Sequence, residues 1–252
     1  MRGKLSKKEL NGALRAHVQG SGVSFLPQSD EDDALHVFAK AFEDDPMFVW
    51  VAGLHRNDAE KGAKMYSLNK ILFTYGSHGS FTGKRGVGLG IRDENDVLAG
   101  CMTLAPSACA KERWNDMLRA FLKAGSPPIY KPKEKGGYGP NARKRLEVLA
   151  KLPKKRINHM KDTKKWIYLQ TIGVLPEYQH GKGYGKKMLN VMLKSADSLK
   201  VPIYLETESE QNESLYKHFG FDTVEVLDVC VKGDTSPDAN MKFWLMRRNP
   251  RG

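Results

Sequence analysis

The stretch WIYLQTIGVLPEYQHGKGYGKKML, residues 166–189, decides the fold. Its first half is an apolar run rich in β-branched and aromatic residues that ends before Pro176, which is typical of a buried strand. Gly181, Gly183 and Gly185 follow at alternate positions, and a helical pattern begins directly behind them. This order predicts an anion site, because the first N–H groups of a helix lack intrahelical partners and the helix dipole is positive there.

The residue types in this turn suit a pyrophosphate. Glycines let the backbone approach a ligand closely and adopt positive φ, and Lys182, Lys186 and Lys187 add positive charge. The turn lacks the G-x-x-x-x-G-K-[ST] spacing of a P-loop, and the chain before it has no repeated βαβ pattern. By spacing alone, a flexible turn that merely starts a helix stays open as the alternative.

The segments on either side of this stretch complete a sheet. Downstream, VPIYLET (201–207) predicts a strand, NESLYKHFG (212–220) a short helix, and FDTVEVLDV and MKFWLMRR two further strands. Upstream we expect a strand at 22–28, a helix from Ser29 that stops before Pro46, a helix at about 58–75 and a hairpin at 86–106. The predicted fold class is therefore α+β with a mixed central β-sheet flanked by helices.

The 252 residues predict one elaborated domain over 21–252, with a loosely attached basic N-terminal extension at 1–20. A basic helical insertion is expected at about 107–163. It contains helices near 112–125 and 142–152 and a mobile loop, rich in Pro, Gly and Lys, at about 126–140.

The formal net charge of +12 is concentrated in one segment. Between Lys131 and Lys165 the chain has 13 Lys and Arg residues against three acids. Such a field attracts polyanions, namely nucleic acid, an acidic protein or a phosphorylated cofactor, although a charge run is more often a solvated surface.

Composition also bears on compartment and metal content. No apolar run approaches the roughly 18 to 20 residues of a membrane span, and the N-terminus lacks the apolar core of a secretory signal. A soluble cytoplasmic protein is expected, with the nucleus as a second possibility, as a monomer or homodimer. The three cysteines (Cys101, Cys109 and Cys230) have no C-x-x-C spacing, so we expect buried free thiols and no metal site.

Three motifs resemble those of the GNAT N-acetyltransferases. HGKGYG (180–185) resembles the [RQ]-x-x-G-x-[GA] loop that binds acetyl-coenzyme A, GVLPEYQ before it resembles the end of that family's fourth strand, and NESLYKHFGF (212–221) resembles its closing motif. AFEDDP (41–46), 166–185 and 201–221 look most similar to the puromycin N-acetyltransferase branch. The pattern departs at His180, where the family usually has Arg or Gln and this chain has Gln179 one residue earlier.

The resemblance implies a GNAT fold with a splayed pair of strands and a cofactor site in the gap. Acetyl-CoA would be the cofactor and coenzyme A the product, and an amide of Asn212 would contact the pantetheine arm. Backbone groups of the fourth strand would hold that arm and the loop the pyrophosphate, giving the cofactor-binding set Ile172, Gly173, Val174, His180, Gly181, Lys182, Gly183, Tyr184, Gly185, Lys186 and Asn212.

The resemblance also implies catalytic and acceptor residues. Tyr216 takes the place of the general-acid tyrosine, because a neutral phenol can give a proton to the departing thiolate; a core aromatic is the alternative. Glu206 is a candidate general base or a structural carboxylate. Asp44, Asp45 and Trp50 follow the first helix, where that family commonly forms its acceptor groove, and would contact the substrate; solvated acids at a helix end are the alternative. The substrate would be a primary amine of a small molecule that attacks directly in a ternary complex.

Two functions of different classes follow. The first is an acetyl-CoA-dependent N-acetyltransferase, for which an aminonucleoside-like, peptide, polyamine or aminoglycoside acceptor is open. The second is a catalytically idle GNAT scaffold that binds nucleic acid or an acidic partner through residues 131–165. The second function has less support, because the basic segment lacks the regularly spaced aromatic residues on which bases would stack.

Overall fold

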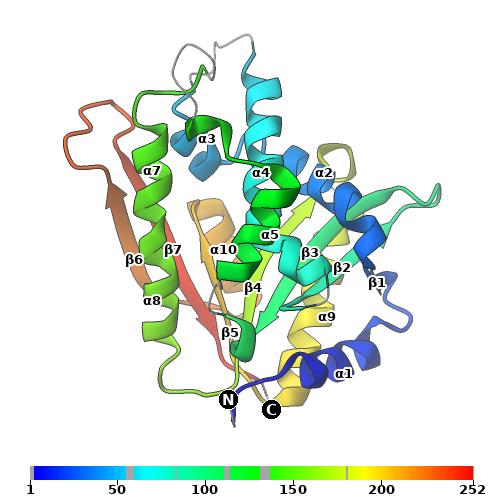
Figure 1. The fold of residues 1–252 in the computed structure, drawn as a ribbon. Coiled ribbons are helices and arrows are strands. Elements are labelled where there is room, and N and C mark those ends of the chain that lie inside the picture. Colours follow the sequence, from blue (N-terminus) through cyan, green and yellow to red (C-terminus); the bar gives the residue numbers. More distant parts are fainter. Residues whose placement is uncertain are drawn as a thin grey trace.

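The structure is a computed structural model that describes residues 3–54, 60–82, 84–110, 114–130, 137–179 and 181–251. Figure 1 shows a sheet with helices on both faces. The helices are α1 Lys7–Val18, α2 Glu31–Ala41, α3 Pro46–Ala52, α4 Lys61–Phe81, α5 Trp114–Ala124, α7 Ala142–Val148, α8 Leu152–His159, α9 Tyr184–Leu199 and α10 Glu210–His218. The strands are β1 Val23–Phe25, β2 Val87–Arg92, β3 Leu98–Pro106, β4 Ile167–Val174, β5 Ile203–Thr207, β6 Asp222–Cys230 and β7 Asn240–Arg248.

The described strands form a seven-stranded sheet in the order β1-β2-β3-β4-β5-β7-β6. Only β4 and β5 pair in parallel; the other neighbours are antiparallel. The helix between these two strands is α9, as a parallel crossover requires. The predicted α+β class with a mixed sheet is confirmed.

Two hydrophobic clusters cover the two faces of the sheet. One face packs on α2, α3 and α4 and includes Phe38, Phe73 and Phe243. The other packs on α1 and α9 and includes Met188, Met192 and Phe221. Residues that alternate along a strand supply both clusters, because successive side chains point to opposite faces.

Residues 3–20 are not a loosely attached extension. They form α1, which packs against α9, and the side chains of Leu5, Leu10 and Leu14 are fully buried. The Ser6 hydroxyl accepts a hydrogen bond from the N–H of Glu9, and the Glu9 carboxylate accepts from the N–H of Ser6. This capping box, S-x-x-E in the sequence, was the signal that predicts a helix start.

Two prolines begin helices that the sequence reading did not predict, although the helix predicted to stop before Pro46 does stop, at Ala41. Pro46 lies in the first turn of α3, and Pro153 in the first turn of α8. Proline is tolerated there because its missing N–H would have no intrahelical partner. The predicted helix at 142–152 is therefore α7, a tight turn at 149–151, and α8.

The insertion is tied to the domain where it is described. The segment predicted as a mobile loop is described at 126–130 and 137–140. There the Gly139 N–H donates to the Ala52 carbonyl at 2.8 Å and the Tyr138 hydroxyl to the Lys64 carbonyl at 2.9 Å. The prediction for 131–136 lies outside the described residues.

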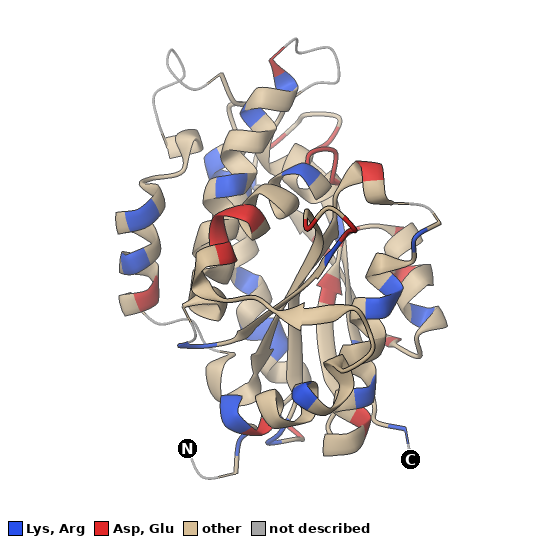
Figure 2. Cartoon of the chain, turned by 90° about the vertical axis from the view of Figure 1, so that its right-hand side faces the viewer, with Lys and Arg blue, Asp and Glu red and all other residues tan. Residues whose placement is uncertain are grey.

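The basic segment is less available to a polyanion than its composition indicates. Among its described residues, 137–165, five cations pair with acids of this chain, and two of these, Arg145 and Arg156, are buried. The pairs are Arg143–Glu147, Arg145–Asp234, Lys155–Glu225, Arg156–Glu206 and Lys165–Glu9. Seen from the side drawn in Figure 2, basic and acidic positions are interspersed over several helices.

The cysteines differ in environment. Cys101, Cys109 and Cys230 are not joined in a disulfide, as expected, but of the three only Cys101 is buried. The prediction of buried thiols is wrong for Cys109, which is half-buried, and for Cys230, which is exposed on an edge strand.

Candidate active site

The sheet opens between β4 and β5. The two strands pair only at Ile167–Ile203 and Tyr168–Tyr204, so beyond Tyr168 the β5-facing edge of β4 has no strand beside it. On the other edge β4 pairs with β3, and a bulge there leaves Gln170 without an opposite residue. The free edge offers backbone N–H and C=O groups to a ligand.

A cavity of roughly 640 Å³ lies at this opening between β4 and β5. Its walls include residues 168–174 of β4, the end of β5, the first turn of α9 and one side of α10. The volume lies within the range of small-molecule and cofactor sites. Ile172, Gly173, Val174, Gly185, Lys186, Asn212 and Tyr216, all predicted site residues, line this one cavity.

The glycine turn has the geometry of an anion cradle. Gly181 and Gly183 have φ of 99° and 66°, a region that favours glycine. Gly183 is the N-cap of α9, and no side chain caps its first turn. The first intrahelical bond here runs from the Lys187 N–H to the Gly183 carbonyl. The N–H groups ahead of Lys187 are thus oriented out of the helix end, toward the mouth of the cavity.

His180, where the family pattern is broken, lies outside the described residues. Its neighbour Gln179 lines the cavity, and its side-chain amide donates to the Val174 carbonyl at 2.9 Å. Lys182 is turned aside, with its ammonium 4.9 Å from the centre of the Tyr178 ring. Tyr184, also in the predicted set, is the first residue of α9.

Two carboxyl groups meet beside the cavity, and one of them, Glu208, lines it. Asp45 caps α3 by accepting hydrogen bonds from the N–H groups of Met47 and Phe48 at 3.0 and 3.2 Å. A hydrogen bond also joins its side chain to that of Glu208, which directly follows β5. Burial and then the Asp45 charge raise the pKa of Glu208 well above its usual range.

A hydrogen bond between two carboxyl groups requires a proton, so Asp45 and Glu208 share one. Burial raises the pKa of Asp45 as well, but the hydrogen bonds that it accepts from the two backbone N–H groups favour its ionised form. The proton therefore resides mainly on Glu208, and the two carboxyls titrate as one unit.

Tyr216 and Asn212 project from α10 toward this pair. The Asn212 amide donates to the Glu208 carboxyl at 3.1 Å, which orients Glu208 rather than leaving the amide free. Burial, with a smaller contribution from Glu208, raises the pKa of Tyr216 above its ordinary value. Tyr216 therefore keeps its proton throughout the neutral range.

Glu206 has a different environment from Glu208. Its carboxylate accepts from the Arg156 guanidinium at 3.0 Å, and both side chains are only 8% exposed. The guanidinium lies 3.5 Å from the centre of the Tyr168 ring. Protonating Glu206 would leave a buried cation without its counter-ion, so this geometry favours a structural role.

The three predicted acceptor residues are not brought together. Asp45 lies beside Glu208, but the Asp44 side chain is 86% exposed and pairs with Lys61 at 2.6 Å. Trp50 is buried, and its ring lies under the Arg145 guanidinium. Neither Asp44 nor Trp50 lines the cavity.

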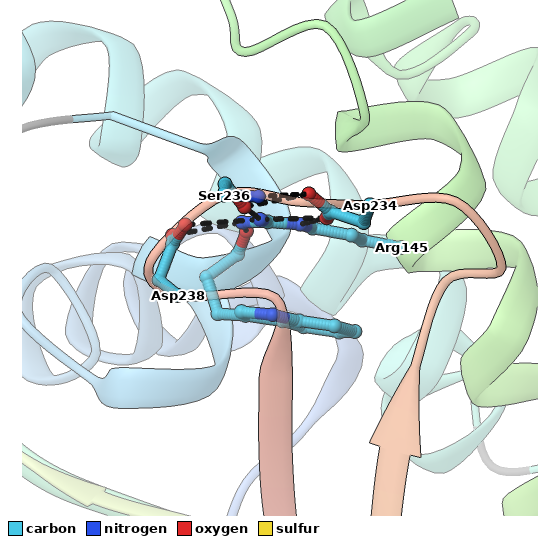
Figure 3. A network of polar contacts seen from close by, with 5 residues as sticks. Arg145, Asp234, Ser236 and Asp238 are labelled. Carbon is cyan, nitrogen blue, oxygen red and sulfur yellow. Dashed lines mark hydrogen bonds and ion pairs between the residues drawn. The ribbon is translucent and has the colours of Figure 1, made fainter.

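Arg145 holds the loop between β6 and β7 against α3. Figure 3 shows its guanidinium among Asp234, Ser236 and Asp238 of that loop. It also donates to the Trp50 carbonyl at 2.7 Å. The basic insertion thus fixes the loop between β6 and β7, and the Trp50 ring and carbonyl both contact the guanidinium that holds it.

Glu208 is the residue that sequence reasoning missed. Its signal was its place, two residues after Glu206 at the end of a strand, where alternate side chains share a face. What the sequence could not indicate was that Arg156 neutralises Glu206 and that Asp45 approaches Glu208.

No group of three or more His, Cys, Asp or Glu side chains within the described ranges is arranged to hold a metal ion. Among the described helices, none has a stretch both long and apolar enough to cross a bilayer.

Comparisons with known proteins agree with this geometry. Residues 147–221 match the model of the acetyltransferase (GNAT) family. An uncharacterised N-acetyltransferase of Schizosaccharomyces pombe is 39% identical over 61 residues, which is 24% of this chain and 24% of that protein. The chain thus matches about a quarter of the length of this relative.

Solved structures share the fold over most of both chains. Arylalkylamine N-acetyltransferase 2 from Aedes aegypti has a TM-score of 0.56 at 14% identity and covers 91% of this chain and 98% of its own. A histone acetyltransferase HPA2 and related acetyltransferase from Corynebacterium glutamicum has a TM-score of 0.52 at 19% identity, with 91% and 96% covered. The matched segment holds β4, the glycine turn, α9, β5 and α10, so the part of the chain that forms most of the cavity is the part that matches the acetyltransferase (GNAT) family.

Proposed function

We propose that the protein is an acetyl-CoA-dependent N-acetyltransferase that acetylates a primary amine of a small molecule by direct attack. The observation that carries this proposal is the one cavity that joins an uncapped helix start, a free strand edge and Glu208 of the half-buried carboxyl pair. These are the three parts that binding a phosphorylated thioester and deprotonating an amine require.

The residues present fit the cofactor. The outward N–H groups at the start of α9, with Lys186 beside them, would hold the pyrophosphate. The free edge of β4 at Ile172 and Val174 would bind the pantetheine arm by strand-like hydrogen bonds. The cofactor supplies a thioester, whose C–S bond breaks as the amine nitrogen bonds to the acetyl carbon.

The chain's own groups would manage the protons. Glu208 and Asp45 would attract the ammonium form of an amine, and the pair takes up the amine's proton once it has released the proton that it stores. Tyr216 donates a hydrogen bond, and then its proton, to the leaving sulfur. We assign the general base to the Asp45–Glu208 pair instead of Glu206, whose charge is committed to Arg156.

A nucleic-acid function has weaker support. Of the ten described cations at 137–165, five pair with acids of the same chain, which reduces the field a polyanion would meet. If the protein showed no salt-dependent binding to duplex DNA, the basic segment would have a structural role only.

Isothermal titration with acetyl-CoA, followed by turnover with a panel of primary amines, tests the proposal. We expect micromolar binding and amine-dependent release of coenzyme A. Lys186→Glu should weaken cofactor binding, whereas Lys194→Glu, exposed further along α9, should not. No binding at high micromolar acetyl-CoA would exclude the enzyme function.

A further inference from the structure

The cavity has an aromatic half that the cofactor arm does not explain, and we propose that it receives an amine with an aromatic body on a short alkyl chain. This inference rests on the proposed N-acetyltransferase function and narrows its acceptor. It commits to one class, the arylalkyl primary amines, against polyamines and small polar amines.

Three phenylalanines form the centre of this half. The ring centres of Phe42 and Phe73 lie 5.0 Å apart, those of Phe48 and Phe73 5.0 Å, and those of Phe42 and Phe48 5.7 Å. They come from the end of α2, from α3 and from α4, and all three line the cavity. Together with Met47, Leu152 and Phe243 they make an apolar chamber on the α2–α4 side of the sheet.

The chamber lies directly against the strand proposed to hold the cofactor arm. A Cβ atom at Gly173 of β4 would lie 3.2 Å from the Phe38 ring and 3.4 Å from the Phe42 ring. The aromatic cluster therefore packs on β4 between Ile172 and Val174. A ring in the chamber would lie beside the free edge of β4, within the same cavity as Glu208.

The charges of the cavity favour one ammonium and exclude a second. Glu206 is neutralised by Arg156, and Asp45 and Glu208 hold one proton between them. The other two acids of the turn after α2, Glu43 and Asp44, pair with Lys40 and Lys61, and neither acid lines the cavity. A second ammonium would have to enter the apolar chamber without a counter-ion. Burying an unpaired charge is unfavourable in free energy, whereas burying an aromatic ring is favourable.

The proposal is tested by kcat/KM at saturating acetyl-CoA for 2-phenylethylamine and tryptamine against ethylamine and spermidine. We expect at least about a tenfold preference for the aromatic amines, the ratio that burial of a phenyl ring supports. If spermidine or ethylamine were turned over equally well or better, the proposal of an aromatic acceptor would be wrong, but the proposed N-acetyltransferase activity would be supported. Failure to bind acetyl-CoA would instead reject the proposed function itself.

Variants of the chamber provide the second arm. Met47→Gln, at a half-buried lining position, should raise KM for 2-phenylethylamine about fivefold or more and leave KM for acetyl-CoA unchanged. Val49→Gln, equally half-buried on α3 but outside the cavity, is the matched control and should leave both constants unchanged. If Met47→Gln fails to fold, Phe42→Leu keeps the chamber apolar but removes a ring. An unchanged ratio of aromatic to alkyl amine turnover in the folded variant would contradict the proposal.

Discussion

The side chains of Asp45 and Glu208 share a hydrogen bond at the point where Glu208 lines the cavity, although they come from opposite halves of the chain. Asp45 is fixed by the first turn of α3 and Glu208 by the Asn212 amide. Because both carboxyls are held in place, the pair can store one proton and exchange it with an amine.

The pair should set the pH dependence of turnover. The base must lose its proton before it can accept one, so kcat should rise with pH through the raised pKa of the Glu208 unit. Glu208→Gln should abolish this ascending limb and lower kcat by about 10²- to 10⁴-fold. Titration with acetyl-CoA should give an unchanged Kd. If kcat of the variant still rose with pH as in the wild type, the general base would have to be another residue.

The same pair should make stability fall with pH. Its folded pKa is raised, so between the unfolded and folded values the folded state binds more protons than the unfolded one. The free energy of unfolding therefore decreases as pH rises across that window, by at most about 1.4 kcal/mol per pH unit, and by less where solvent screens the charges. Denaturant melts of Glu208→Gln should lack this decrease. Parallel curves for the two proteins would refute the shared proton.

Tyr216→Phe should separate chemistry from binding. The variant keeps the ring that packs on Phe221 and removes only the hydroxyl. We expect kcat to fall about 10²-fold or more with cofactor affinity and melting temperature nearly unchanged. Wild-type turnover in the variant would make Tyr216 a core aromatic.

The glycine turn should be intolerant of side chains. Gly183→Ala places a Cβ on a residue with φ of 66°, which strains the turn that orients the first N–H groups of α9. We expect weaker binding of acetyl-CoA and a loss of about 1 kcal/mol of stability. Gly12→Ala, in a helix with open space around it, should keep cofactor affinity and match or exceed wild-type stability. Calorimetry and thermal melts compare the two variants.

Arg145 should be a stability residue of the basic insertion. Arg145→Ala leaves Asp234, whose side chain is 1% exposed, without its guanidinium partner. The melting temperature should drop by roughly 5 °C or more. The neighbouring exposed pair supplies the control, since Arg143→Ala removes a contact with Glu147 that solvent already screens. A similar small effect of both variants would show that the loop between β6 and β7 is held by other contacts.

The sequence by itself determined the fold class, the hairpin, the anion-cradling turn and the position of Tyr216 on α10. Those features depend on residues close together in the chain, where periodicity, glycines and capping have local physical causes. The same local reasoning would have found α1 from its S-x-x-E box. It could not tell whether Pro46 and Pro153 end one helix or begin the next, since proline suits both positions.

Only the tertiary structure decided which charges are available. Arg156, from the insertion, neutralises Glu206. Arg145 donates a hydrogen bond to the Trp50 carbonyl and packs on its ring, and Asp45 forms a hydrogen bond with Glu208. The proton affinity of a carboxyl depends on burial and on partners from distant segments. For that reason the sequence motifs were sufficient to locate the candidate site. Which carboxyls in it can exchange a proton depends on two contacts, that of the insertion with Glu206 and that of α3 with Glu208.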